Sequence, residues 1–427
     1  MQIGIIGSGI SGLSVAWLLS QRYEVTLIEK SASLGMSHLN SDFEGFSIDV
    51  PLRIFSNLYH ENLFKFYSYL GEEFEQATLS ASFCFKDRIA KAQFKAFMPD
   101  LVPVYLPSLT NLSNLSSLWG VSWQGAVKIA QATRFYAETL RAIGQNLDTL
   151  SFGQFLQERR LKDEGYQQYV APFLLLAFSC THELLETLSA GMVLRFIRLF
   201  VVSRWYRLRN GSTQLAEKLA NKIAVIKTNC AVESIVLPKG KVKKIQVVCP
   251  DKVHKFDHVV LAVEAKQVPL LLQNESCFKH ELFKRFSYKL NTVWVHSDKG
   301  LMPKQKRHWS QVNYFLNQSK DDEISNYSTV WLNSFPSFKA RLDYPVFQSF
   351  NPSIEPKEEY VLTKSKALRA IMTPESLKAT QEIKAMQGHK NLWFCGSYVE
   401  PGGTLQEESL LSAMYIAKEF GIEIPWL

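Results

Sequence analysis

The 427-residue sequence lacks the features that mark several large classes of protein. Its six cysteines stand singly, with no C-x-x-C pair and no Cys/His group at zinc-ligand spacing, which predicts reduced thiols and no metal site. No uninterrupted apolar run reaches the roughly 20 residues that span a bilayer. The chain also begins without the basic segment of a secretory signal. These absences predict a cytoplasmic protein.

The excess of basic residues is small. The formal net charge is +8, and no zinc finger, basic zipper or RNA-recognition signature accompanies it. Because nucleic-acid binding normally needs basic residues gathered on one face of such a module, we expect no nucleic-acid partner. The length suggests two or three domains at roughly 150 residues each.

The chain opens with a pattern typical of a nucleotide-binding unit. Residues 2–6 predict a buried strand, residues 7–12 (GSGISG) a turn, and residues 13–22 a helix. A second apolar run at 24–28 ends at Glu29. The order strand, G-x-G-x-x-G turn, helix, strand and acidic residue is the fingerprint of a Rossmann dinucleotide site.

Each residue of this motif has a physical role. Gly7 allows the sharp turn, Gly9 lets a pyrophosphate approach the backbone, and Gly12 lets the helix pack close to the strand. The positive end of the helix dipole favours phosphate. Glu29 is expected to accept hydrogen bonds from ribose hydroxyls and to disfavour a 2′-phosphate, and therefore an NADP-type ligand. The alternative is a tight turn without a ligand.

The rest of the chain predicts two interleaved domains. Aromatic and helical patterning fills the interior, short β-branched runs follow from 224 to 263, and a strand, a glycine turn and a helix return after 391. No low-complexity linker separates these parts. We assign 1–75, 205–272 and 388–427 to the nucleotide-binding domain, and 76–204 and 273–387 to a substrate domain.

Both ends of the chain carry a family resemblance. Residues 3–29 (IGIIGSGISGLSVAWLLSQRYEVTLIE) and 391–417 (NLWFCGSYVEPGGTLQEESLLSAMYIA) resemble the flavin-containing amine oxidase superfamily of glutathione-reductase-like FAD proteins. Shorter matches lie at 205–219, 259–263 and 301–303. The resemblance implies an α/β fold, with a Rossmann-type FAD-binding domain and an interleaved substrate domain of helices and sheet. It also implies a non-covalent FAD and hydride transfer from a substrate C–H, next to nitrogen or allylic, to flavin N5.

The fingerprint and the resemblance together predict a set of cofactor-binding residues and no assignable catalytic side chain. The set comprises Gly7, Ser8, Gly9, Ile10, Ser11, Gly12, Glu29, Lys30, Gly35, Met36, Arg53, Val232, Gly396, Gly403, Thr404 and Leu405. One departure concerns residues 34–38 (LGMSH), where the family usually has Gly-Gly-Arg or Gly-Gly-His. Arg53 either supplies the missing positive charge near the flavin or forms a salt bridge.

Two other kinds of residue are functional candidates. Some relatives attach flavin through cysteine, but Cys395 lies in a predicted strand, so we expect it to pack as a small buried side chain. His60, His182, His296 and His308 are expected to be ordinary polar or half-buried residues.

Within the region 192–209, residues 192–202 predict a strongly apolar helix with arginines on one side, and Arg204, Arg207 and Arg209 follow it. Such a helix can lie on an anionic membrane surface, which would place the protein at the inner membrane and favour a lipidic substrate. The alternative is a substrate-domain helix with solvated arginines.

For the whole chain we expect an FAD-dependent oxidoreductase acting on a small molecule. The alternatives are a flavin-dependent isomerase or mutase without net redox, and a non-enzymatic FAD-binding protein. The sequence predicts neither the substrate nor the oligomeric state.

Overall fold

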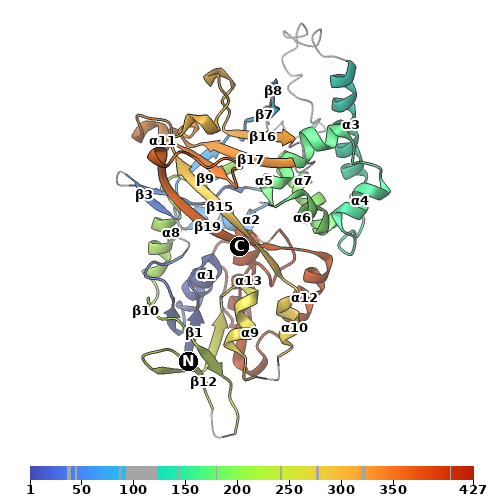
Figure 1. Ribbon diagram of the computed structural model, residues 1–427. Coiled ribbons are helices and arrows are strands. Elements are labelled where there is room, and N and C mark those ends of the chain that lie inside the picture. Colours follow the sequence, from blue (N-terminus) through green and yellow to red (C-terminus); the bar gives the residue numbers. More distant parts are fainter. Residues whose placement is uncertain are drawn as a thin grey trace.

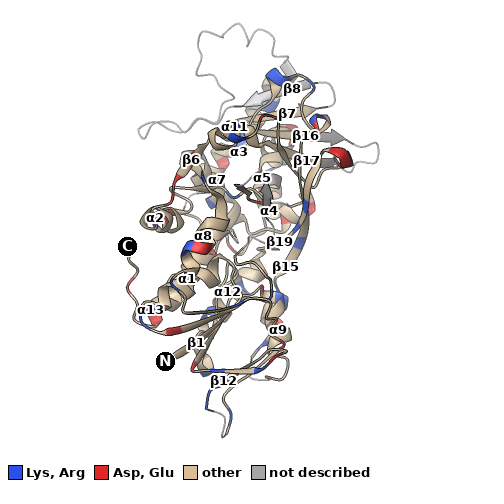
Figure 2. Cartoon of the chain, turned by 90° about the vertical axis from the view of Figure 1, so that its left-hand side faces the viewer, with Lys and Arg blue, Asp and Glu red and all other residues tan. Residues whose placement is uncertain are grey.

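The computed structural model describes the whole chain except residues 36–39, 44–45, 86–87, 93–122, 143, 179, 241–242, 276–277, 319–323 and 404. Figure 1 shows two lobes, a lower one built around the N-terminal strand and an upper one built on a large sheet. In Figure 2 the basic and acidic positions of the described residues are interspersed along the chain in both lobes. The small basic excess is therefore not confined to one segment of the described chain.

The lower lobe is built on a five-stranded parallel sheet. Its order is β10 (Val225–Lys227), β2 (Glu24–Ile28), β1 (Gln2–Ile6), β14 (His258–Leu261) and β20 (Leu392–Phe394). All four strand pairings are parallel. The central strands are buried on both faces, as expected for uniformly apolar runs in a parallel sheet.

Helices cover this sheet and hold its strands together. Helix α1 (Ile10–Leu19) contacts α13 (Gln406–Glu419) and α8 (Gly211–Ala220), and α13 contacts α2 (Glu61–Tyr69). Residues 11–19 of α1 are all buried. A helix apolar on all sides is stable only when neighbours surround it, and here the C-terminal helix supplies one of them. The predicted α/β class with a Rossmann-type domain is confirmed.

Two small sheets and a hairpin lie outside the parallel sheet and the large upper sheet. The first sheet is antiparallel and consists of β11 (Ser234–Val236), β12 (Ile245–Val248) and β13 (Val253–Phe256). The second consists of β5 (Phe55–Ser56), β9 (Trp205–Leu208) and β6 (Phe74–Ala77), and the hairpin of β3 (Ser41–Phe43) and β4 (Phe46–Ile48).

The upper lobe contains a seven-stranded sheet and a group of helices. The sheet runs β19 (Val361–Ile371), β15 (Ser287–His296), β18 (Phe347–Phe350), β17 (Ile324–Trp331), β16 (Val312–Gln318), β7 (Ala81–Phe85) and β8 (Arg88–Ala92), with only β16 and β7 parallel. The helices are α3 (Trp123–Arg141), α4 (Phe152–Glu158), a π-helical turn (Tyr166–Val170), α5 (Ala171–Ala177), α6 (His182–Thr187), α7 (Ala190–Val202) and α11 (Pro336–Arg341).

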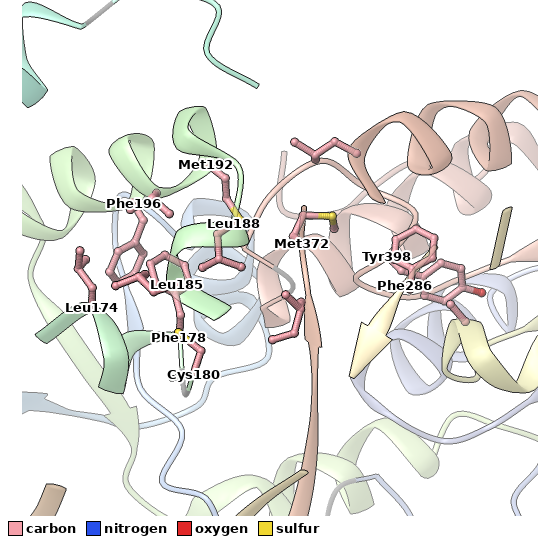
Figure 3. Packing of buried hydrophobic residues seen from close by; sticks show 14 of the residues in the cluster. Leu174, Phe178, Cys180, Leu185, Leu188, Met192, Phe196, Phe286, Met372 and Tyr398 are labelled. Carbon is pink, nitrogen blue, oxygen red and sulfur yellow. The ribbon is translucent and has the colours of Figure 1, made fainter. Parts of the chain in front are cut away.

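Helix α7 is the apolar, arginine-bearing segment of the sequence. Its residues Met192 and Phe196 are buried in the core and lie beside Leu174 and Leu185 of neighbouring helices (Figure 3). Arg195 is exposed and pairs with Asp148 at 2.9 Å. The apolar side of α7 thus packs inside the protein, and contact of this region with a membrane stays a prediction. No helix among the described residues combines the length and apolarity needed to cross a bilayer.

Three further helices lie against the lower lobe in Figure 1: α9 (Val268–Leu271), α10 (His280–Lys284) and α12 (Pro374–Ala385). The ring of Phe283 in α10 contacts Phe394 of β20 at 5.1 Å between centroids. Thr380 of α12 donates a hydrogen bond to the Tyr398 carbonyl at 2.9 Å. The boundaries predicted at 273 and 387 therefore separate elements that pack together, and the division into domains stays a prediction.

Candidate functional site

A cleft of about 870 Å³ begins at the glycine turn and reaches the large sheet of the upper lobe. This volume is in the range of natural ligand sites. Most predicted cofactor residues line it: Gly7, Ser8, Gly9, Ile10, Ser11, Glu29, Lys30, Gly35, Arg53, Val232, Gly396 and Leu405. Gly12 and Gly403 lie behind its surface, and Met36 and Thr404 fall outside the described residues. The fold thus brings together positions more than 390 residues apart.

The three glycines of the turn have different structural roles. A side chain at Gly7, which has a φ of 96°, would collide with the Ala262 carbonyl, and one at Gly12 would collide with the Gly7 carbonyl. These two glycines let strand and helix pack closely. At Gly9 a Cβ would meet nothing within 4 Å, and no side chain caps α1 there. Gly9 therefore leaves open a cradle at the positive end of a buried helix, where phosphate binds well.

Glu29 lines the cleft beside the glycine turn. Its Oε2 accepts hydrogen bonds from the Ser8 amide at 2.8 Å and the Ser8 hydroxyl at 2.7 Å, and its Oε1 accepts from the Ser31 amide at 2.8 Å. Burial raises the pKa of this carboxyl, but the hydrogen bonds from Ser8 and Ser31 outweigh it and lower the pKa below its usual value. Glu29 is therefore ionised at neutral pH and aligned with the turn.

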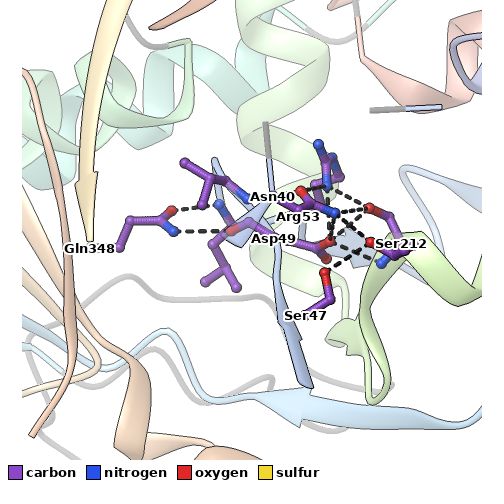
Figure 4. A network of polar contacts seen from close by, with 9 residues as sticks. Asn40, Ser47, Asp49, Arg53, Ser212 and Gln348 are labelled. Carbon is purple, nitrogen blue, oxygen red and sulfur yellow. Dashed lines mark hydrogen bonds and ion pairs between the residues drawn. The ribbon is translucent and has the colours of Figure 1, made fainter. Parts of the chain in front are cut away.

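Arg53 forms a buried ion pair and also lines the cleft (Figure 4). Its Nη1 donates to Asp49 Oδ1 at 2.9 Å and to the Ser212 hydroxyl at 2.6 Å. Asp49 in turn accepts from the Ser212 amide at the start of α8. Gln348 of the upper sheet bonds the Leu52 amide at 2.5 Å and the Asp49 carbonyl at 3.0 Å. The predicted salt bridge exists, and it lies where the two lobes meet.

The loop before α13 is held by a buried carboxylate. Glu408 accepts hydrogen bonds from the Gly403 amide at 3.1 Å and the Leu405 amide at 2.8 Å. A Cβ at Gly403 would lie 2.6 Å from the Tyr59 hydroxyl. Burial and the charge of Glu408 raise the pKa of Tyr59 well above its ordinary value. The structure thus gives Gly403 a packing contact and brings Leu405 to the cleft.

Cys395 is completely buried between the first and last helices. Its Sγ lies 3.3 Å from the Ser412 hydroxyl and 3.7 Å from the Ser11 carbonyl. Burial raises the pKa of this thiol to about 12. A protonated thiol is a poor nucleophile, so the environment favours packing over a covalent link to a cofactor.

This environment predicts the behaviour of a Cys395→Ala variant. We expect it to bind flavin in the wild-type ratio, with a modest loss of stability of about 1 kcal/mol from the small cavity. Acid precipitation of the wild-type protein should release all of its flavin. An intact-protein mass that includes flavin, and that becomes flavin-free in Cys395→Ala, would contradict the prediction.

Of the four candidate histidines, His182 and His308 are half-buried, as expected, while the other two are more deeply buried than the sequence suggested. His60 is 3% exposed and His296 is fully buried. Burial lowers the pKa of His60 to about 3 and that of His296 to about 4. His60 lines the cleft, and its Nδ1 accepts from the Ser56 amide at 3.1 Å, which assigns the proton to Nε2. It is a neutral imidazole at physiological pH.

Two polar atoms of the cleft have no protein partner among the described residues. The hydroxyl of Tyr398 and the Nδ2 of Asn291 are both buried, and neither makes a hydrogen bond. An unsatisfied buried polar group costs roughly 1–3 kcal/mol, so these atoms indicate a place for ligand atoms. Nothing in their sequence context marked them. Together with the cradle at Gly9, they show that the residues present fit a bound dinucleotide.

The upper end of the cleft is mostly apolar. Its walls include Phe173, Phe196, Phe200, Trp205, Tyr314, Val330 and Phe335. Lys366 and Arg369 of β19 also line the cleft, and burial lowers the pKa of Arg369. Neither residue lies in a recognisable motif, so the sequence did not indicate them.

The comparisons with known proteins agree with this architecture. The NAD(P)-binding Rossmann-like domain family matches residues 5–70. The structure is similar to a CLA-producing fatty acid isomerase from P. acnes, with a TM-score of 0.67 and 14% identity over 98% of each chain. It is similar to a putative protoporphyrinogen oxidase from Exiguobacterium sp., with a TM-score of 0.67 and 13% identity over 99% of each chain.

A third similar structure is cyclohexylamine oxidase from Brevibacterium oxydans, with a TM-score of 0.63 and 14% identity over 98% of this chain and 99% of that one. No curated protein matches the chain by sequence. The identities are low, but coverage is almost complete in each case. The chain therefore matches a Rossmann-like nucleotide-binding family over residues 5–70 and shares its overall fold with these flavoenzyme-like structures.

Proposed function

We propose that the chain is an FAD-dependent oxidoreductase that takes a hydride from a C–H bond of a small, mainly apolar molecule. The supporting observation is the single cleft that joins the open cradle at Gly9 to an apolar chamber in the upper lobe. Bound FAD would supply the hydride acceptor at the junction of the two parts. The shared fold with oxidases supports the same reaction class.

The chain's own residues would bind the cofactor, orient the substrate and shield the reacting carbon from water. Gly9 and the N-terminus of α1 would hold phosphates, and Glu29 would accept from ribose hydroxyls. The Tyr398 hydroxyl and Asn291 Nδ2 would donate to polar atoms of the bound molecules. The aromatic walls of the upper chamber would exclude water from the reacting carbon.

The charges of the chamber favour an anionic substrate over an amine. Lys366 and Arg369 line it, while Glu264, a cleft carboxylate other than Glu29, already pairs with Lys266 at 3.3 Å. A protonated amine would be repelled by these two cations, whereas a carboxylate would be attracted. The substrate class that fits is an apolar chain bearing an acidic group, with the reacting C–H in an allylic position.

The test starts with the absorption spectrum of the purified protein, which we expect to show bound flavin. Unsaturated fatty acids and primary amines would then be mixed with the protein without oxygen and scored by bleaching of the flavin band. Bleaching by the acids and not by the amines supports the proposal. A colourless protein that takes up no FAD overturns it. Product of unchanged mass, formed without an electron acceptor, would instead indicate an isomerase.

A Lys366→Met variant tests the substrate class. We expect the KM for an acidic substrate to rise roughly 10-fold, with kcat little changed, because the lost contact acts on the bound ground state and the transition state alike. The matched control is Lys364→Met, an exposed lysine of the same strand that stacks on Trp294 and does not line the cleft. Equal effects of the two substitutions would rule out the assigned role.

A further inference from the structure

Four metal-binding side chains meet beside the cofactor cleft. Cys230, Cys249, Asp251 and His254 each place one donor atom so that all four atoms lie within 4.8 Å of one another. In a tetrahedral zinc site with bonds of about 2.3 Å, sulfur ligands lie about 3.8 Å apart. The cluster is thus only about 1 Å wider than a closed zinc shell. The sequence predicted no metal site because 18 residues separate the two cysteines.

The donor set has the chemistry of a zinc site. Two thiolates, one imidazole and one carboxylate are ligands that zinc takes in four-coordinate sites, whereas Mg²⁺ and Ca²⁺ prefer oxygen alone. The Nε2 of His254 is buried and makes no hydrogen bond with any described residue. A buried ring nitrogen without a partner is unfavourable, and a bound cation would account for it.

These residues come from two separate segments of the chain. Cys249 and His254 flank the turn between β12 and β13, where the Cys249 amide donates to the Lys252 carbonyl at 3.0 Å and Val247 pairs with His254. Cys230 comes from the segment after β10, and its amide donates to the Glu29 carbonyl at 2.9 Å. The cluster therefore joins an outer hairpin to the edge of the ribose site.

Charge and exposure suit a structural ion. Cys249 is 4% exposed, Cys230 and His254 are half-buried, and Asp251 is exposed. Two thiolates, a carboxylate and Zn²⁺ sum to a charge of about −1, and the ammonium groups of Lys227 and Lys252 act on this cluster. Four protein ligands leave no open position, which is the pattern of structural rather than catalytic zinc.

We propose that Cys230, Cys249, Asp251 and His254 bind one Zn²⁺ that fastens the β12–β13 hairpin to the cofactor cleft. Cys230 and Val232 both line that cleft. The ion would fix this wall in place, so its loss should loosen FAD binding and lower the melting temperature. The metal content itself can be measured without any activity.

The test is metal analysis of the holoprotein, purified with a thiol reductant and without chelator. We expect about one zinc per chain. Cys249→Ser should lose the metal. Asp251→Asn changes an exposed side chain, so it should fold normally and bind zinc at least roughly 10-fold more weakly. The control is Cys84→Ser, which changes a half-buried cysteine of β7 outside the cluster. This variant should keep its zinc.

Two results would overturn the proposal. One is wild-type protein that lacks zinc and takes up none when Zn²⁺ is added to its reduced form. The other is a Cys230–Cys249 disulfide, found by peptide mass analysis of protein purified under reducing conditions. Cobalt(II) reconstitution gives an independent readout, because cobalt in a tetrahedral thiolate site absorbs strongly in the visible range. Cobalt added to the Cys249→Ser variant, or to protein with a Cys230–Cys249 disulfide, should give no such band.

Discussion

A Gly9→Val variant should lose FAD while its polypeptide stays folded. The valine would occupy the open cradle at the start of α1, where the pyrophosphate is proposed to lie, and its Cβ meets no protein atom within 4 Å. The φ of −57° at this position suits any residue. We expect FAD affinity to fall by roughly 100-fold or more, which corresponds to about 2.7 kcal/mol, measured as flavin absorbance per protein after gel filtration.

The matched contrast is Gly12→Val. Its side chain would collide with the Gly7 carbonyl, so this variant should fail to fold rather than fail to bind. Circular dichroism and thermal melting of the two apoproteins separate these outcomes. A Gly9→Val protein that still carries flavin in the wild-type ratio would refute the role given to the cradle.

An Asp49→Asn variant should be strongly destabilised. Asp49 is 1% exposed and Arg53 is 8% exposed, and the carboxylate also accepts hydrogen bonds from the start of α8. Breaking a buried ion pair from one side costs about 3–5 kcal/mol. Because the amide can still accept from Ser212, we expect a loss of about 3 kcal/mol in the free energy of unfolding, measured by denaturant titration.

The control for this prediction is Glu61→Gln. Glu61 pairs with Lys65 at 2.7 Å, but both side chains are about half exposed. Exposed pairs contribute at most about 1 kcal/mol, so the denaturation midpoint should scarcely move. Similar midpoints for Asp49→Asn and Glu61→Gln would show that the network at the lobe junction carries little stability.

The nucleotide end of the cleft could be predicted because its signal is local. The turn at 7–12 and Glu29 lie within a single βαβ unit, so spacing alone indicates what they do. The return of the chain at 391–417 was recognisable from its resemblance, and it does complete the sheet and cover α1. Only in the first unit are neighbours in sequence also neighbours in space, whereas the C-terminal return was indicated by its resemblance alone.

The substrate end and the proposed zinc cluster could not be predicted for the opposite reason. Asn291, Tyr398 and Lys366 come together only through the pairing of distant strands and loops. Cys230 and His254 meet only because β12 and β13 form a hairpin that folds back toward β10. The burial of α7 was equally hidden, since an amphipathic helix has the same pattern whether its apolar side meets a membrane or a protein core.

The order of strands in the parallel sheet has a consequence for biosynthesis. Strand β1 is made long before β20 and α13, which complete its surroundings. A ribosome-bound chain shorter than about 394 residues has no complete sheet. Because α1 packs against α13 and β14 pairs with β20, apolar surfaces of the first strand and helix stay partly uncovered until residues 392–419 have been synthesised. During that interval these surfaces are exposed to aggregation.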